Sequence, residues 1–294
     1  MGVIMFGKEL LIKQFGCNQS DVLGYKIPPS VNIFVKVTKG CNAKCLFCSN
    51  ANTKDTTKKF NLPKLLSIIQ EFQNQNIIIN RINITGGEPS LVPNLVQSIL
   101  DKFSNPVHRN IHFHLNTNGL FQQSQELMRN RRWNSISVSL HHYDTLKLSE
   151  LYATPVSGAA FAFEGIDTNK VNVSCNLIRG YIDCAEEVCK MLDFTLELGI
   201  TRIGFVSLMK INDYCQNHYV DFEDIHLDSI PHVYFTKSMN RGKDCKCSNF
   251  LYNKGLKILE IYTRNYMNPY YCESAFIYDG EYLRQGFHED NIIC

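Results

Sequence analysis

Apolar residues recur along the chain with two different periods. Short runs rich in β-branched and aromatic residues alternate with longer stretches in which apolar residues return every three or four positions. The short runs predict six β-strands, at 31–37, 81–85, 111–117, 135–140, 171–178 and 202–209.

The longer stretches predict helices between these strands. The clearest lies at 61–73, where Asn61 is an expected N-cap, Pro63 an early helical residue, and the apolar residues fall on one face. Stretches 90–103 and 184–199 repeat the pattern, and Gly199 is expected to end the latter.

Strands that alternate with helices predict a mainly parallel sheet with right-handed crossovers. The periodicity leaves open whether the sheet is doubly wound or curled into a full or partial barrel. In either architecture the functional groups gather at the carboxyl ends of the strands. The distinctive residues lie there: Cys41 to Cys48 follow the first strand, Gly86 to Pro89 the second, Asn116 to Gly119 the third, and His141 and His142 the fourth.

The alternation stops near residue 212, and a polar, turn-rich stretch follows. We therefore expect an N-terminal segment at 1–30, a core at 31–212 and a C-terminal extension at 213–294. Within the extension, 276–287 predicts a β-hairpin that turns at Asp279 and Gly280.

Composition excludes a disordered or fibrous protein, because 44% of the 294 residues are hydrophobic. The net charge of +2 provides no global attraction to nucleic acid or to an anionic membrane. Lys8, Glu9 and Lys13 interrupt the first apolar run, which does not fit a signal peptide, and no stretch reaches the roughly 18 apolar residues of a membrane span. We predict a soluble, cytoplasmic protein with no membrane partner.

Twelve cysteines in a chain without an export signal favour metal binding or catalysis over disulfides. The candidate ligands are those that cluster or stand near the end of the chain: Cys41, Cys45, Cys48, Cys245, Cys247, Cys272 and Cys294. The scattered cysteines are expected to be buried packing residues.

The loop CNAKCLFC places three thiols within eight residues, so that they can converge on one metal centre. A structural zinc site normally has four protein ligands, but the next histidine is as distant as His108. Three cysteines on an iron-sulfur cluster would leave one iron open, as a reactive site requires. Zinc with a remote fourth ligand remains the alternative.

CxxxCxxC after a strand, with Phe47 before its last cysteine, resembles the signature of radical S-adenosylmethionine (SAM) enzymes. The motif ITGGEPS at 84–90 resembles the GGEP motif that ends the second strand in this family. The resemblance implies a partial (β/α)6 TIM-like barrel with a [4Fe-4S] cluster on Cys41, Cys45 and Cys48. It also implies SAM chelated to the open iron, and a reductant such as flavodoxin or ferredoxin.

The same resemblance implies a set of residues that contact or shape the SAM site. Gly86 and Gly87 would bring their backbone close to the amino group of SAM, and Phe47 would lie near its adenine. The remaining positions implied at this site are Glu88, Pro89, Ser139, Asn176 and Arg179.

Cys245, Cys247 and Cys272 lie where many members of the family carry an auxiliary iron-sulfur cluster. Gln285, Gly286 and Phe287 stand where such members have a further cysteine, so the cluster is expected either to keep an open iron or to be closed by Cys294. Free thiols or a zinc site are the alternatives.

The core at 31–209 most resembles the molybdenum-cofactor cyclase branch and its peptide-modifying relatives with SPASM or twitch extensions. The CxC pair and the terminal NIIC differ from that cyclase, so we do not expect GTP as the substrate. His141 and His142, at the expected barrel mouth, are candidate catalytic residues because imidazole exchanges protons near neutral pH.

The leading functional hypothesis is hydrogen abstraction from a ribosomally made peptide or a small biosynthetic intermediate. A non-catalytic zinc protein is the alternative from another class. Action on a nucleotide or nucleic acid is a third hypothesis, and nucleic acid is disfavoured because the charge is balanced.

Overall fold

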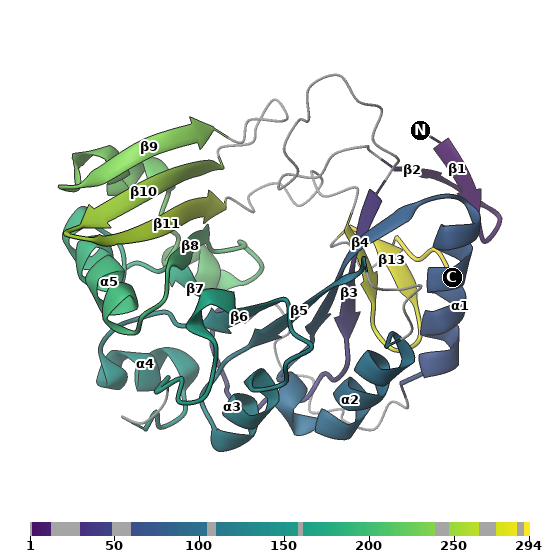
Figure 1. Cartoon of the computed structure of the whole chain (residues 1–294). Helices are drawn as coiled ribbons and strands as arrows, with labels where there is room; N and C mark the ends of the chain where they lie inside the picture. Colours follow the sequence, from purple (N-terminus) through teal and green to yellow (C-terminus); the bar gives the residue numbers. More distant parts are fainter. Residues whose placement is uncertain are drawn as a thin grey trace.

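The computed structural model describes residues 2–12, 30–48, 60–104, 110–157, 161–238, 247–264, 275–286 and 291–294. Cys245 and Cys272 lie outside these ranges. Most of the strands join one eleven-stranded sheet with the order β13-β12-β3-β4-β5-β6-β7-β8-β11-β10-β9. The sheet curves into an open arc with the helices outside it (Figure 1).

The middle of the sheet consists of the six strands that the sequence predicts, and each runs parallel to the next in chain order. These strands are β3 (Ser30–Lys36), β4 (Ile78–Thr85), β5 (His112–Thr117), β6 (Ser135–Ser139), β7 (Val171–Leu177) and β8 (Arg202–Ser207). Their order confirms the partial barrel and excludes the doubly wound sheet, in which the strand order reverses at a switch point.

The predicted helices form between these strands. Helix α1 (Leu62–Asn74) begins where the Asn61 side chain accepts a hydrogen bond from the Lys64 backbone N–H, as expected of an N-cap. Helix α2 (Pro93–Lys102) starts later than predicted because Pro89–Leu91 forms a separate 3-10 turn. Helices α3 (Gln122–Met128), α4 (Thr145–Tyr152) and α5 (Ala185–Glu197) follow. Past α5, Gly199 takes the left-handed conformation that it was expected to supply.

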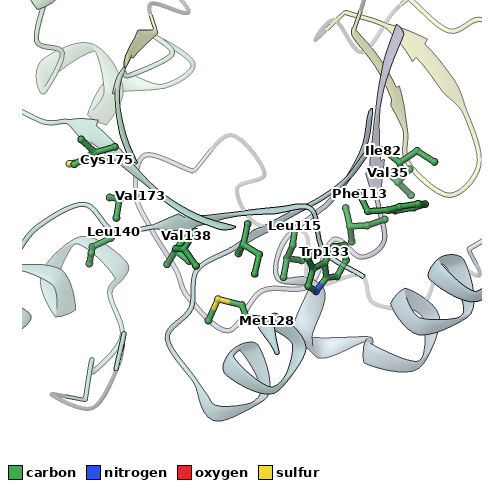
Figure 2. Close-up of a cluster of buried hydrophobic side chains, with 14 of the residues drawn as sticks. Val35, Ile82, Phe113, Leu115, Met128, Trp133, Val138, Leu140, Val173 and Cys175 are labelled. Carbon is green, nitrogen blue, oxygen red and sulfur yellow. The ribbon is translucent and has the colours of Figure 1, made fainter. Parts of the chain in front are cut away.

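The hydrophobic core lies between the convex face of the sheet and the helices. Side chains alternate along a strand, so one set of positions packs outward, including Ile82, Leu115, Val138 and Val173. Figure 2 shows these residues on the outer side of the curved sheet, together with Trp133. The positions of opposite parity therefore face the inside of the arc.

The C-terminal region extends the sheet at both ends. Strand β11 (Lys257–Arg264) pairs in parallel with β8, and β10 (Ser248–Lys254) and β9 (Val233–Ser238) follow it in antiparallel order. At the other end, β12 (Ala275–Tyr278) pairs in parallel with β3, and β13 (Leu283–Gln285) completes the predicted hairpin.

Part of the stretch interpreted as irregular is ordered. It contains α6 (Asp213–Asn217), α7 (Phe222–Ile225) and β9. At the N-terminus, β1 (Gly2–Met5) and β2 (Lys8–Leu11) form a separate hairpin. In the described part of the chain, no helix combines the length and apolarity needed to cross a bilayer.

Candidate active site

The loop after β3 carries Cys41, Cys45 and Cys48, and all three line one cavity of about 330 Å³ at the carboxyl ends of the strands. The backbone N–H of Ala43 donates to Cys41 Sγ at 3.4 Å, and that of Lys44 donates to the carbonyl oxygen of Tyr152 at 2.8 Å. These contacts fix a loop that turns three thiols toward a shared space.

The thiols are close enough to influence one another. Burial, together with the neighbouring charges of Cys48 and Cys41, raises the pKa of Cys45 to about 12. Burial also raises the pKa of Cys41, with Glu88 and Cys48 adding to the effect. A metal ion reverses this tendency, because it stabilises the thiolate form of a bound cysteine. Three thiols that line one cavity fit a metal centre by residue type, although in the described part of the chain no three His, Cys, Asp or Glu side chains already converge as a ligand group.

The turn after β4 packs against this loop, backbone to backbone. The N–H of Gly87 donates to the Thr38 carbonyl and that of Glu88 to the Gly40 carbonyl, each at 2.8 Å. A Cβ on Gly86 would lie 2.3 Å from the Thr38 oxygen, and one on Gly87 would lie 2.0 Å from the Gly40 oxygen. Only glycine permits this approach, which explains why the two stand together in the sequence.

Glu88 and Pro89 lie behind the cavity and are not among its lining residues. The Glu88 side chain is fully buried and accepts hydrogen bonds from the Ser90 N–H at 3.0 Å, the Thr117 hydroxyl at 2.8 Å and the Asn118 N–H at 2.8 Å. Burial raises its pKa, while these donors act in the opposite direction. The carboxyl group thus joins the turn after β4 to the turn after β5.

Four of the predicted site residues line the cavity, namely Phe47, Ser139, His141 and Asn176, and their contact with SAM or substrate stays a prediction. The Phe47 and His141 rings meet edge to face, with centroids 4.9 Å apart. His141 Nδ1 accepts the Asn176 backbone N–H at 3.1 Å, so the proton of the neutral ring resides on Nε2. Burial lowers the pKa of His141 to about 3. This pKa makes His141 a neutral hydrogen-bond donor near pH 7, and its catalytic role stays a prediction.

His142 and Arg179 do not reach the cavity. His142 is fully buried, and its Nδ1 accepts the Asp144 N–H at 2.9 Å while Nε2 lies 3.7 Å from a Glu187 oxygen. Burial lowers its pKa to about 4. The Arg179 side chain is exposed and donates to the Tyr219 carbonyl at 3.3 Å. Both residues therefore form hydrogen bonds within the surrounding loops and do not line the cavity.

The cavity also includes residues that the sequence did not single out as site residues. They come from the carboxyl-terminal parts of four core strands, β4, β5, β7 and β8, and the turn after β5: Thr85, Asn116, Thr117, Asn118, Ser174, Val206 and Ser207. Polar residues at strand ends are ordinary, so the only available signal was the NTNG sequence after the third strand.

Below the cavity the concave face of the sheet is polar. None of the six core strands contains Asp or Glu. Strand β4 presents Arg81 and Asn83 to this face. Arg81 Nε and Asn83 Nδ2 are buried and have no hydrogen-bond partner within the described residues. Further along the face, Ser135 bonds to both His112 and His114, and Tyr262 accepts a hydrogen bond from Asn172.

The C-terminal cysteines are only partly described. Cys247 is buried immediately before β10. Cys294 lies beside β13, where its carbonyl accepts the Leu283 N–H at 2.9 Å. Strands β10 and β13 are near opposite edges of the sheet, so the structure does not bring these two cysteines together. An auxiliary site on Cys245, Cys247 and Cys272 stays a prediction.

Sequence comparison places this site in a known family. The profile of the Radical SAM superfamily matches residues 35–204. A "Probable GTP 3',8-cyclase" of Saccharolobus islandicus is 24% identical over 90% of this chain and 85% of its own length. A "7-carboxy-7-deazaguanine synthase" of Methanothermobacter thermautotrophicus is 33% identical, over 32% of this chain and 35% of its own length.

Solved structures agree on the fold. Streptococcus suis SuiB bound to S-adenosylmethionine superposes with a TM-score of 0.51 at 18% identity, over 66% of this chain and 44% of SuiB. This chain therefore spans less than half of SuiB. A radical SAM methyltransferase from Sphaerobacter thermophilus gives a TM-score of 0.53 at 16% identity, over 68% of this chain and 62% of its own. The chain belongs to the radical SAM superfamily and is an enzyme with the partial barrel of that family.

Proposed function

We propose that this enzyme holds a [4Fe-4S] cluster on Cys41, Cys45 and Cys48 and binds SAM in the adjoining cavity. One observation carries the proposal: three thiols from one loop, a glycine backbone and the polar ends of the core strands all line the same 330 Å³ cavity. When bound, the two cofactors supply a 5'-deoxyadenosyl radical, formed by reductive cleavage of SAM, that abstracts hydrogen from the substrate.

The chain itself orients and encloses SAM. The backbone of Gly86 and Gly87 lines the part of the cavity that would receive the methionine end, and Phe47, Ser139 and Asn176 offer one aromatic and two polar surfaces for the nucleoside end. His141 presents a neutral N–H donor, because its other ring nitrogen is already occupied by the Asn176 N–H. Its fixed tautomer suits a group that positions a ligand without protonating it.

An apolar cluster beside the cysteine loop would limit water around the radical. Phe47, Leu151, Ile178, Leu208 and Cys215 form this cluster. Asn212 Nδ2 donates to the Leu46 carbonyl at 3.1 Å, so α6 also ties down the far end of the loop. Exclusion of water protects a reactive intermediate from unwanted reactions.

For the substrate, a ribosomally made peptide or a small biosynthetic intermediate fits a cavity that opens at the mouth of a partial barrel. An auxiliary cluster on Cys245, Cys247 and Cys272 would help to bind it or accept an electron, and flavodoxin or ferredoxin would supply the reductant. The substrate class, the auxiliary cluster and the reductant are all carried over from the sequence predictions.

A nucleotide is the second candidate substrate, favoured by the concave face. A buried N–H without a partner is costly, and an anionic ligand would remove that cost at Nε of the half-buried Arg81. The amide of Asn83 adds a donor on the same strand face, and the core strands carry no acid to repel a phosphate. The cyclase and synthase relatives, whose names refer to guanine compounds, point the same way.

The proposed function is tested by metal content and SAM cleavage. Anaerobically reconstituted protein should contain iron and sulfide and should release 5'-deoxyadenosine after addition of SAM and dithionite. Cys41→Ala/Cys45→Ala/Cys48→Ala should lose about four irons and all nucleoside release. Cys184→Ala, which removes an exposed thiol at the start of α5, is the matched control and should lose neither. Zinc without iron, and no nucleoside, would refute the proposal.

The substrate class is tested through Arg81. If the substrate is a nucleotide, Arg81→Gln should weaken anaerobic binding of GTP to the SAM-loaded enzyme at least tenfold. Arg202→Gln, which removes an exposed arginine paired with Glu260, should not. Wild-type enzyme that ignores GTP but changes the mass of a peptide encoded beside its gene would favour the peptide.

A further inference from the structure

The side-chain amide of Asn118 reaches the cysteine loop from the turn after β5. Its Nδ2 donates to Asn42 Oδ1 at 2.7 Å and is directed at Cys41 Sγ across 3.9 Å. The two hydrogens of one amide nitrogen can serve both acceptors. Asn118 thus donates to the Cys41 sulfur from outside the cysteine loop.

The orientation of this amide is determined by its other contacts. Asn118 Oδ1 accepts the Leu120 backbone N–H at 3.1 Å, so the oxygen cannot face the cysteine loop without losing that bond. The backbone N–H of Asn118 is held by buried Glu88 at 2.8 Å. Asn118 itself is 8% exposed. The amide is therefore a preorganised donor with its N–H groups toward the loop.

We propose that Asn118 raises the reduction potential of the cluster by donating an N–H···S hydrogen bond to the Cys41 thiolate. Hydrogen bonds to ligand sulfur stabilise the added negative charge of a reduced iron-sulfur cluster, and they are among the features that set its potential. Cys41 is the exposed member of the three thiols, and it also receives the Ala43 N–H at 3.4 Å. The inference rests on the proposed function, because it takes Cys41 as a cluster ligand.

Glu88 acts in the opposite sense through its charge. A carboxylate near a cluster opposes the addition of an electron, and Glu88 is close enough to raise the pKa of Cys41. Glu88 nevertheless holds the donor in place through the Asn118 backbone. Glu88 is therefore a positioning residue that acts through Asn118, whereas Asn118 itself donates to the Cys41 sulfur.

The experiment is a redox titration monitored by electron paramagnetic resonance, following the cluster signal that changes when SAM is added. Asn118→Leu removes the donor at similar size and should shift the potential of that signal to a more negative value. Asn118→Asp also adds a negative charge and should shift it further. Asn94→Leu is the matched control, because it makes the same change at an exposed position of α2, and its potential should equal that of wild type.

Two outcomes separate this inference from the proposed function. A wild-type chain that holds no iron would overturn both. A SAM-responsive signal whose potential is the same in wild type and Asn118→Leu would overturn this inference alone.

If Asn118→Leu retains no iron, wild-type protein labelled with ¹⁵N at the asparagine side-chain amide provides the second measurement. Electron spin echo modulation of the reduced cluster should then show coupling to that nitrogen. Absence of the coupling would overturn the inference.

Discussion

The buried carboxylate of Glu88 accepts the backbone N–H of Asn118 at 2.8 Å, and this bond joins two turns that both contact the cysteine loop. On one side Glu88 follows the glycine pair that packs on Thr38 and Gly40. On the other, Asn118 reaches Asn42 and Cys41. The acidic residue of the GGEP motif thus organises the site from behind, without lining the cavity.

Replacement of Glu88 should therefore loosen the cysteine loop. In Glu88→Gln an amide replaces an acceptor-only group, so at least one of its four donors loses its partner, at a cost of about 1–3 kcal/mol. Chemical unfolding should show the loss of stability, and reconstitution should show reduced iron content. Glu126→Gln, on the surface of α3, is the control. It should change the free energy of unfolding by no more than about 0.5 kcal/mol and should leave the iron content unchanged.

The glycine pair should tolerate no side chain. A Cβ at Gly87 would meet the Gly40 backbone oxygen at 2.0 Å, and backbone atoms move aside only if the two loops separate. Gly87→Ala should cost about 4 kcal/mol or prevent folding, and folded protein should bind little iron. Gly255→Asn is the control, because Gly255 lies in an open turn at φ 64° that asparagine accepts. Equal iron content in the two variants would contradict the close-packing argument.

Buried imidazoles should make the protein sensitive to mild acid. Burial lowers the pKa of His114 from 6.5 to about 3, so the unfolded chain binds this proton more readily than the folded chain. The effect is absent above pH 6.5 and grows as the pH falls toward 3, by at most about 1.4 kcal/mol per pH unit.

This contribution can be isolated with His114→Gln. The variant should lose less stability than wild type between pH 7.5 and 5, although it starts lower because the 2.6 Å bond to Ser135 is altered. Unfolding midpoints measured across this range test the slope. An unchanged slope in His114→Gln would contradict the expectation.

Gly204 and Tyr262 should be energetically coupled. The Tyr262 ring lies over Gly204, where a Cβ would come within 2.1 Å of its Cε2 atom. Gly204→Ala should therefore cost about 1–3 kcal/mol in the wild-type background and less in Tyr262→Leu, where a smaller side chain leaves room. Unfolding of the two single variants and the double variant measures the coupling. Strictly additive effects would show that the ring moves away without cost.

The partial barrel could be predicted because the residues that define each core strand and helix end lie close together in the sequence. Each core strand is a short apolar run, and Asn61 and Gly199 mark helix ends through their own backbone bonds and conformations. Strand β9 was missed because its exposed Tyr234 and Phe235 break the expected alternation of buried and polar positions. Its place in the sheet depends on pairing with β10, a tertiary contact that periodicity does not encode.

The site could be predicted where its chemistry requires particular residue types at fixed spacing in the sequence. Three cysteines in one loop and two adjacent glycines carry their own signal, whereas Asn118 gains its meaning from contacts with Cys41 and Glu88. His141 and His142 are neighbours in sequence, yet only His141 faces the cavity. That difference arises from the turn after β6 and cannot be predicted from two identical residue types.

The pairing of β12 with β3 has a consequence for biosynthesis. Strand β3 leads directly into the cysteine loop, but its outer edge is satisfied by Ala275–Tyr278, which leave the ribosome long after it. A nascent chain therefore carries an open parallel edge beside the cysteine loop until residues 275–278 have been synthesised, a state exposed to misassociation and dependent on slow, non-local closure. Stable iron loading of this site should accordingly be delayed until β12 has joined the sheet.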